Sequence, residues 1–264
     1  MGPEIMYNSS ERRIRPRTKE AGEARKGTDG KPGEWLGLAP DERQAELLRS
    51  PARRLLLNCT RQWGKSTITA AKAVERAQTR AGSLTLVLSP SARQSGEFLR
   101  KAAAFLRRLD IKPRGDGANE ISLLFPNGSR IVGLPGTEST VRGFSAVSLM
   151  LIDEAARVPD ELYVAVRPML AVGNGDLWLM STPCGKRGFF WEEWANGGPV
   201  WKRVSVPATE CPRIPPSFLE EERASMSERC FRQEYLCEFE EAEDALFSRE
   251  LIERAITDEV KPLF

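Results

Sequence analysis

The sequence predicts an α/β fold, in which a mainly parallel central sheet has helices on both faces and a small helical subdomain follows. Residues 55–58 and 83–88 are apolar runs typical of buried strands, and each precedes a segment with helical spacing, residues 65–80 and 92–108. Alternation of strand and helix favours parallel pairing, because the crossover helices cover the sheet. Two further strand-like runs, SLMLI and DLWLM, extend the same sheet.

The composition excludes several classes of function. The chain has 264 residues, 41% of them hydrophobic, and a net charge of +2, which is ordinary for a globular protein and not typical of a strong DNA binder. No run is long enough for a membrane span, so no membrane partner is expected. Five scattered cysteines without a C-x-x-C pair argue against a zinc site, and the lack of histidine excludes Ser-His-Asp chemistry. A carboxylate therefore has to act as any general base.

The two ends of the chain differ from its middle. The N-terminal stretch is charged and has few large apolar residues before Trp35, which predicts a flexible arm. Residues 216–256 carry apolar residues at helical spacing and are expected to be helical, with Cys230 and Cys237 on one helix face. The expected organisation is an arm (1–34), an α/β core (35–210) and a helical lid or linker (211–264).

The segment that follows the first strand, CTRQWGKST, predicts a phosphate-binding loop. Only the second half of the G-x-x-x-x-G-K-[ST] motif matches, because Cys59 stands at the first glycine. Loop amides and a helix N-terminus favour an anion, Lys65 would reach the β- and γ-phosphates, and Ser66 would ligate Mg²⁺. The expected nucleotide-binding loop comprises Thr60, Arg61, Gln62, Trp63, Gly64, Lys65, Ser66 and Thr67.

Asp153 and Glu154 end the SLMLI strand, at the edge of the sheet where open α/β folds bind ligands. Neighbouring strand residues point to opposite sides, so Asp153 is expected to hold Mg²⁺ and Glu154 to orient and deprotonate the attacking water. Thr182 ends the next strand, within a Ser-Thr-Pro sequence that is also a common turn signal, and it could contact the γ-phosphate. Together the two motifs predict Mg²⁺-dependent ATP hydrolysis.

Two weaker signals have alternative explanations. Gln44 follows an expected helix cap at Asp41 and could bond an adenine edge, or it could be a surface glutamine. A basic cluster at the end of the helix 92–108 and beyond could follow a DNA backbone, or it could be a solvated helix end. The cluster comprises Lys101, Arg107, Arg108, Lys112 and Arg114. Residues 120–133 predict a β-hairpin around Pro-Asn-Gly.

These motifs, in their order, resemble the ATPase domain of the large terminase subunit, the motor that packages DNA into phage capsids. The resemblance covers about residues 35–256 and rests on PDERQAELL, LLLNCTRQWGKST, LTLVLSPSARQSGE, TVRGFSA, LMLIDEAARV and LMSTPCGKRG. The Cys-Thr-Arg-Gln loop start is itself typical of that family. The resemblance implies a P-loop NTPase fold of the ASCE type.

The resemblance also implies roles for single residues. Gln44 becomes the adenine-side glutamine and Thr182 the centre of a coupling motif. Arg61 is similar to an arginine that senses the γ-phosphate within its own subunit, and Arg142 matches an arginine finger inserted into the neighbouring subunit's site. Arg43 stands where the family usually has tryptophan.

By the same resemblance, the chain is expected to drive double-stranded DNA into a procapsid, in the host cytoplasm. Its implied cofactors are ATP and Mg²⁺, and its implied partners are DNA, the portal protein, the small terminase subunit and further copies of itself in a ring, pentameric on the capsid. A nuclease domain is expected to be absent, since little chain follows Glu240. Two alternatives are a superfamily 2 helicase-like ATPase fragment and a DNA-binding assembly module with a degenerate nucleotide site.

Overall fold

A seven-stranded sheet forms the centre of the protein. The computed structural model describes residues 33–119, 121–136 and 143–241. The strand order is β3-β4-β2-β5-β6-β1-β7, and every neighbouring pair is parallel except β3 with β4. The strands are β1 (Arg54–Cys59), β2 (Leu84–Ser89), β3 (Ser122–Leu124), β4 (Arg130–Pro135), β5 (Leu149–Asp153), β6 (Asp176–Ser181) and β7 (Lys202–Val206).

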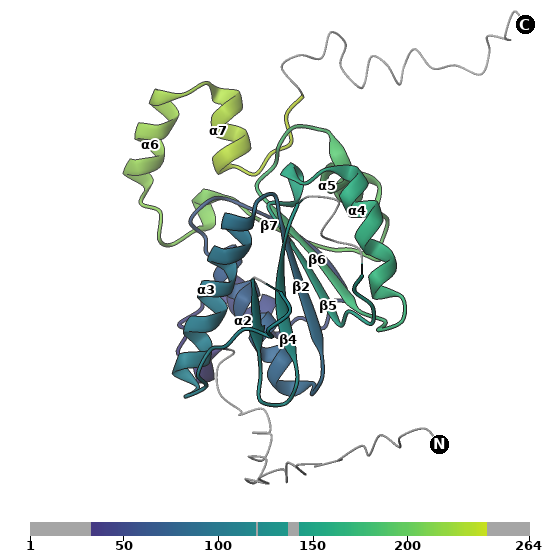
Figure 1. Cartoon of the computed structure of the whole chain (residues 1–264). Coiled ribbons are helices and arrows are strands. Elements are labelled where there is room, and N and C mark those ends of the chain that lie inside the picture. The colour runs from purple at the N-terminus through teal and green to yellow at the C-terminus, as the bar shows by residue number, and fades with distance from the viewer. Residues whose placement is uncertain (1–32, 120, 137–142, 242–264) are drawn as a thin grey trace, which may run out of the picture.

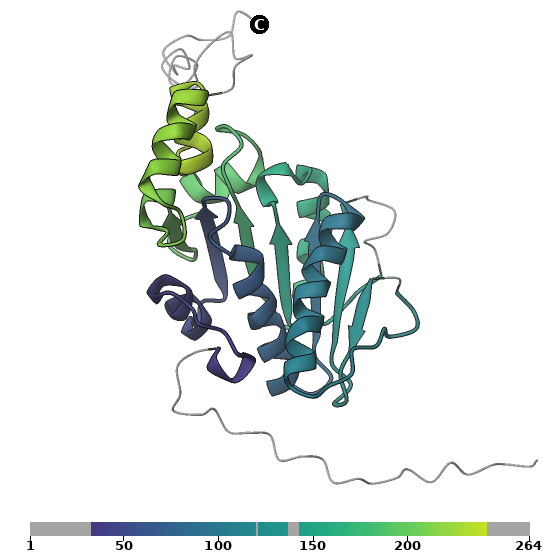
Figure 2. The same ribbon diagram turned by 90° about the vertical axis from the view of Figure 1, so that its left-hand side faces the viewer.

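Helices cover both faces of this sheet, as the sequence predicts. On one face lie α2 (Lys65–Thr79) and α3 (Ala92–Arg108), and on the other α4 (Asp160–Val166) and α5 (Gly188–Asn196) (Figure 1). The short helix α1 (Glu42–Arg49) packs against α2. Figure 2, turned by 90°, shows α2 and α3 in front of the strands. No helix in the described ranges is long and apolar enough to cross a membrane.

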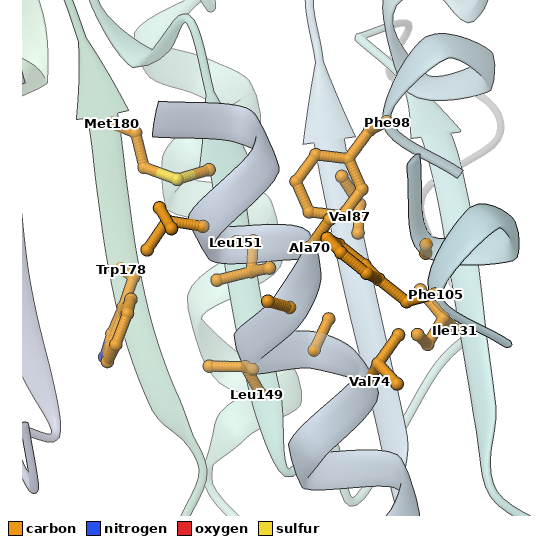
Figure 3. Packing of buried hydrophobic residues seen from close by; sticks show 14 of the residues in the cluster. Ala70, Val74, Val87, Phe98, Phe105, Ile131, Leu149, Leu151, Trp178 and Met180 are labelled. Carbon is orange, nitrogen blue, oxygen red and sulfur yellow. The ribbon is translucent and has the colours of Figure 1, made fainter. Parts of the chain in front are cut away.

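Two hydrophobic cores result from the alternation of side chains along the strands. Leu55 and Leu57 of β1 face α2 and α3, whereas Leu56 joins the core on the side of α4 and α5. Figure 3 shows the first core, in which Ala70 and Val74 of α2 and the aromatic residues of α3 pack on the sheet. The small alanines let α2 approach the strands closely. This packing fixes the position at which α2 begins.

The parallel register lines up the ends of three neighbouring strands. Asp153, the last residue of β5, lies opposite Met180 of β6, and Met180 lies opposite Leu57 of β1. The residues that follow these strands therefore meet at one edge of the sheet. Because β6 lies between β1 and β5, the chain segments after all three strands can contact one ligand.

The predicted hairpin is confirmed, and its strands β3 and β4 form one side of the sheet. Strands β3 and β4 pair antiparallel, and Leu123 lies opposite Ile131. In the turn, the amide of Gly128 donates to the carbonyl of Phe125 over 3.0 Å, and φ of Gly128 is 81°. That left-handed conformation favours glycine.

Residues 216–256 are expected to be helical, and the described part of this segment is helical only as far as Tyr235, with a break. Two helices are present, α6 (Pro216–Ser225) and α7 (Glu228–Tyr235). They separate because the Ser227 side chain accepts a hydrogen bond from the Cys230 amide and caps a new helix. Residues 236–241 are not helical, and residues 242–256 lie outside the described ranges, as do residues 1–32 of the predicted arm.

The two cysteines of this segment do not share a helix face, contrary to the prediction. Cys230 is exposed on α7. Cys237 follows the helix, has φ of 59° and is buried against β7, where its thiol donates to the carbonyl of Val206. The helix ends two residues before Cys237, so a spacing of seven residues does not place Cys230 and Cys237 on one helix face.

A core substitution tests the placement of β5. Leu151 is 0% exposed at the centre of the sheet, so Leu151→Ala should lower the free energy of unfolding by about 2–5 kcal/mol. Urea denaturation of the full chain measures this. Val172→Ala is the control, because Val172 is 82% exposed and its change should stay within about 0.5 kcal/mol. Equal effects of the two substitutions would contradict the fold.

Thiol reactivity tests the docking of the segment after α7. Burial raises the pKa of the Cys237 thiol to about 12, so this thiol stays protonated and shielded, whereas Cys230 is exposed. N-ethylmaleimide at pH 8 should modify Cys230 at least about 100-fold faster than Cys237, as read by peptide mass spectrometry. Comparable rates would show that the segment is not held against β7.

Candidate active site

The loop between β1 and α2 has the backbone of a phosphate-binding turn. Gln62 and Gly64 have φ of 64° and 93°, and the amides of Thr67 and Ile68 both donate to the carbonyl of Gly64 over 3.0 Å. A Cβ on Gly64 would lie 3.2 Å from Nε2 of Gln44, in a conformation that side chains rarely adopt. The first amides of α2 have no acceptor within the helix, so they can bind an anion at this point.

Gln44 is buried at 4% exposure, and is not the surface glutamine of the alternative explanation. Its Oε1 accepts a hydrogen bond from the Asp41 amide over 3.2 Å, which completes a capping box. Its Nε2 donates to the carbonyl of Trp63 over 2.6 Å. Gln44 therefore anchors the phosphate-binding loop to α1, beside the position where the loop ends.

Arg213 supports the same carbonyl and was not predicted. Its guanidinium donates to Trp63 O and lies 3.2 Å from Oδ2 of Asp41. The Trp63 side chain is itself 1% exposed. Trp63 therefore anchors the loop inside the protein, while its carbonyl is held by Gln44 and Arg213.

The acidic pair after β5 lies directly against the phosphate-binding loop. Nζ of Lys65 is 3.2 Å from Oε1 of Glu154. The Ser66 hydroxyl donates to Oδ2 of Asp153 over 3.0 Å. Glu154 has φ of 54° and ψ of 44°, a left-handed conformation that turns the chain sharply at the strand end. The structure thus brings together the four residues on which the prediction of nucleotide hydrolysis rests.

Burial and charge set the protonation of this cluster. Burial disfavours the Lys65 ammonium, but the carboxylates of Glu154 and Asp153 outweigh it, so the pKa of Lys65 lies above its usual value. Burial, with repulsion from Glu154, raises the pKa of Asp153, although Lys65 and Ser66 oppose the shift. A buried carboxylate of this kind is stabilised by any additional cation at the site.

The oxygen atoms of Ser66 and Asp153 fit a magnesium ion. Mg²⁺ prefers hard oxygen ligands in octahedral geometry at about 2.1 Å, which places neighbouring ligands about 2.9 Å apart. The two side-chain oxygens here are 3.0 Å apart. The described residues contain no group of three or more acidic, cysteine or histidine side chains that could hold a metal by themselves. Mg²⁺ generally takes its remaining ligands from phosphate and water.

Thr182 lies beside Glu154, and an unpredicted residue joins them. Nη1 of Arg157 donates to Oε2 of Glu154 over 3.1 Å and to Oγ1 of Thr182 over 3.2 Å. Thr182 is 1% exposed. The preceding residue, Ser181, accepts a hydrogen bond from the Ala156 amide over 3.2 Å. Residues after β5 and β6 thus form one network.

Arg61 and Thr60 contact α7. Nε of Arg61 lies 2.7 Å from Oε2 of Glu234, and this hydrogen bond raises the pKa of Arg61. The Thr60 hydroxyl donates to the carbonyl of Glu234 over 3.2 Å. Oε1 of Glu234 is 3.5 Å from Nη2 of Arg157. Figure 2 shows α6 and α7 beyond the end of the sheet to which the arrows of the parallel strands point.

The predicted DNA-binding residues do not share one environment. Arg108 donates from Nη1 to the carbonyls of Leu36 and Gly37, each over 2.9 Å, and so holds the start of the described chain. Lys101 is half-buried on α3. The remaining members, Arg107, Lys112 and Arg114, are exposed. Arg142, the predicted arginine finger, lies outside the described residues.

Sequence patterns could have indicated only part of what was missed. Arg157 follows Glu154 by three residues, a spacing that favours contact within one helical turn. Glu234 and Arg213 lie 173 and 150 positions away in sequence from their partners Arg61 and Trp63. No local pattern identifies such pairs.

Comparisons with known proteins show which family this chain resembles. A family model described as "Terminase large subunit, T4likevirus-type, N-terminal" matches residues 56–254. The large terminase subunit of Thermus phage G20c is 26% identical over 251 residues, a match that covers 81% of this chain and 52% of that protein. The chain therefore spans about half the length of the curated relatives it matches.

Solved structures show the same fold. The large terminase ATPase domain of Thermus phage P74-26 aligns with a TM-score of 0.67 and 24% identity, over 78% of this chain and 96% of that one. The large terminase of a thermophilic bacteriophage, in complex with ADP, aligns with a TM-score of 0.63 and 14% identity, over 75% of this chain and 53% of that one. The predicted P-loop fold of the ASCE type is confirmed.

The family match covers well over half of the chain and includes the phosphate-binding loop, the acidic pair and Thr182. The chain belongs to the family of terminase large subunits, of which it contains the N-terminal region.

Proposed function

We propose that the chain hydrolyses ATP in a Mg²⁺-dependent reaction. The observation that carries this proposal is the contact of Lys65 with Glu154 and of Ser66 with Asp153, at 3.2 and 3.0 Å. Each pair joins a phosphate-binding residue to an acidic residue at one point. The ADP complex of the thermophilic bacteriophage terminase supports a nucleotide at this site.

Lys65 would exchange one anion for another when ATP binds. Its side chain is 9% exposed and its ammonium pairs with Glu154, and a buried cation has to keep an anionic partner. The γ-phosphate can replace that carboxylate, which releases Glu154 to orient and deprotonate the attacking water. Mg²⁺, held by Ser66 and Asp153, would neutralise charge on the β- and γ-phosphates.

The residues around this pair complete the proposed site. Arg61 would leave Glu234 to contact the γ-phosphate, and Thr182 would report the state of that phosphate to the strand edge. Gln44 would present the free hydrogen-bonding capacity of its amide to adenine. The loop amides of residues 61–66 would bind the phosphate chain, whereas the amides of Thr60 and Thr67 already donate to the carbonyls of Val206 and Gly64.

Hydrolysis would drive double-stranded DNA into a procapsid. The family assignment supports this role, and with it a ring of copies, pentameric on the capsid, that contacts the portal protein and the small terminase subunit in the host cytoplasm. The exposed residues Arg107, Lys112 and Arg114 are available to a DNA backbone. Arg142 would act in the site of a neighbouring copy.

Removal of the catalytic carboxylate charge tests the proposed hydrolysis. Glu154→Gln should lower kcat at least about 100-fold, because an amide cannot accept the water proton. Affinity for ATP-γ-S, measured by calorimetry, should stay within about threefold. Glu161→Gln is the matched control, since Glu161 is exposed on α4. Unchanged turnover in Glu154→Gln would refute the assignment.

Mixing of variants tests the finger in trans. Arg142→Ala should lower turnover by about 10³-fold, because a cation that offsets charge on the γ-phosphoryl group is lost. An excess of Glu154→Gln protein, which still carries Arg142, should restore turnover to Arg142→Ala protein. ATPase assays over a dilution series measure this. Turnover per subunit that is independent of concentration, with no restoration, would exclude the trans role.

A further inference from the structure

Arg157 contacts three separate parts of the nucleotide edge. Nη1 donates to Oε2 of Glu154 over 3.1 Å and to Oγ1 of Thr182 over 3.2 Å, and Nη2 lies 3.5 Å from Oε1 of Glu234. The side chain is 30% exposed, so these contacts are partly shielded from water. The planar guanidinium presents its donors in a fixed fork and can hold all three oxygens in one geometry, whereas an ammonium is a compact charge with rotatable donors.

If Lys65 leaves Glu154 to contact a phosphate, Arg157 is the remaining cation that holds the Glu154 carboxylate. In the structure Oε1 of Glu154 pairs with Lys65 and Oε2 pairs with Arg157. Loss of the first partner leaves Arg157 to hold the carboxylate. A carboxylate that has to direct a water molecule loses rate when its orientation is not fixed, by up to about 100-fold for a displacement of about 1 Å.

Glu234 fixes the far side of Arg157 from another part of the chain. Its side chain is 18% exposed, and its carboxylate lies between Arg157 and Arg61. The backbone around it is also anchored, since Thr60 donates to the Glu234 carbonyl and Asn58 to the Cys237 carbonyl, over 3.2 and 2.7 Å. These hydrogen bonds fix the backbone that carries Glu234, so that its carboxylate can direct the Arg157 side chain.

We propose that Arg157 is a positioning residue for Glu154, and that Glu234 of α7 keeps Arg157 in the productive orientation. This inference rests on the proposed ATP hydrolysis. Through Glu234, α7 would then help to orient the catalytic Glu154, whether or not the helix also contacts nucleotide. Displacement of α7 would then lower the rate of hydrolysis without removing any group that touches ATP.

Steady-state kinetics of the full chain test the role of Arg157. Arg157→Ala should lower kcat by about 10-fold or more and leave ATP-γ-S affinity within about threefold, because Arg157 acts through Glu154. Arg157→Lys should recover part of the lost kcat, because it restores the positive charge but not the planar guanidinium. Arg167→Ala is the matched control, because Arg167 also pairs with a glutamate, Glu193, away from the site.

A double-substitution cycle tests the role of Glu234. Glu234→Gln should lower kcat by about threefold. This effect should be smaller in the Arg157→Ala background, because the part that Glu234 exerts through Arg157 is then already lost, and only the part exerted through Arg61 remains. Glu228→Gln is the matched control on the same helix, because the pair of Glu228 with Arg223 is exposed. Additive effects of Glu234→Gln and Arg157→Ala would overturn the role of Glu234.

Amide hydrogen exchange supplies a readout that does not depend on turnover. In the nucleotide-free chain, Arg157→Ala should speed exchange across residues 228–235 by about threefold or more, whereas Arg167→Ala should not. Unchanged exchange in this helix would overturn the coupling of α7 to Arg157.

The failure of this inference differs from failure of the proposed function. Normal turnover in the unsubstituted chain together with an unimpaired Arg157→Ala variant would overturn the positioning role alone. So would parallel losses of kcat and of ATP-γ-S affinity, which indicate a binding role. An unsubstituted chain that binds ATP-γ-S but hydrolyses no ATP would overturn the proposed function and the inference with it.

Discussion

The structure depends on one partly buried ion pair, between Lys65 at the start of α2 and Glu154 after β5. A lysine with a side-chain exposure of 9% has to keep an anion within reach, because an unpaired buried charge is costly. The same requirement makes the site responsive to a triphosphate, which offers a stronger anion at the same place. The pair is thus both a stabilising contact and the point at which nucleotide would change the arrangement of charges.

The rest of the fold places these two side chains. Strands β1, β6 and β5 are neighbours in parallel register, so their carboxyl ends form one edge. The alanine-rich face of α2 packs closely on that sheet and fixes where the helix begins (Figure 3). Around the edge, Arg157 and Glu234 extend the ion pair into a network that includes α7. Packing, register and charge therefore all converge on the loop around Lys65.

The sequence predicts the elements more reliably than the contacts between them. The helix expected over residues 92–108 is α3 (Ala92–Arg108), because a strong apolar repeat and a capping serine define it. The convergence of Lys65 and Glu154 was also predictable, since parallel strands align their ends. The break at Ser227 was missed, because a local cap overrode a longer apolar repeat. The burial of Gln44 and the contacts of Glu234 and Arg213 depend on tertiary packing, which no local pattern encodes.

A structure of the full chain with ATP-γ-S and Mg²⁺ tests the central claim most directly. The account predicts that Nζ of Lys65 leaves Glu154 and lies within hydrogen-bonding distance of the terminal phosphate, while Mg²⁺ contacts Ser66 and Asp153. Nucleotide bound at another site, or a Lys65 that stays on Glu154 beside bound nucleotide, would contradict it.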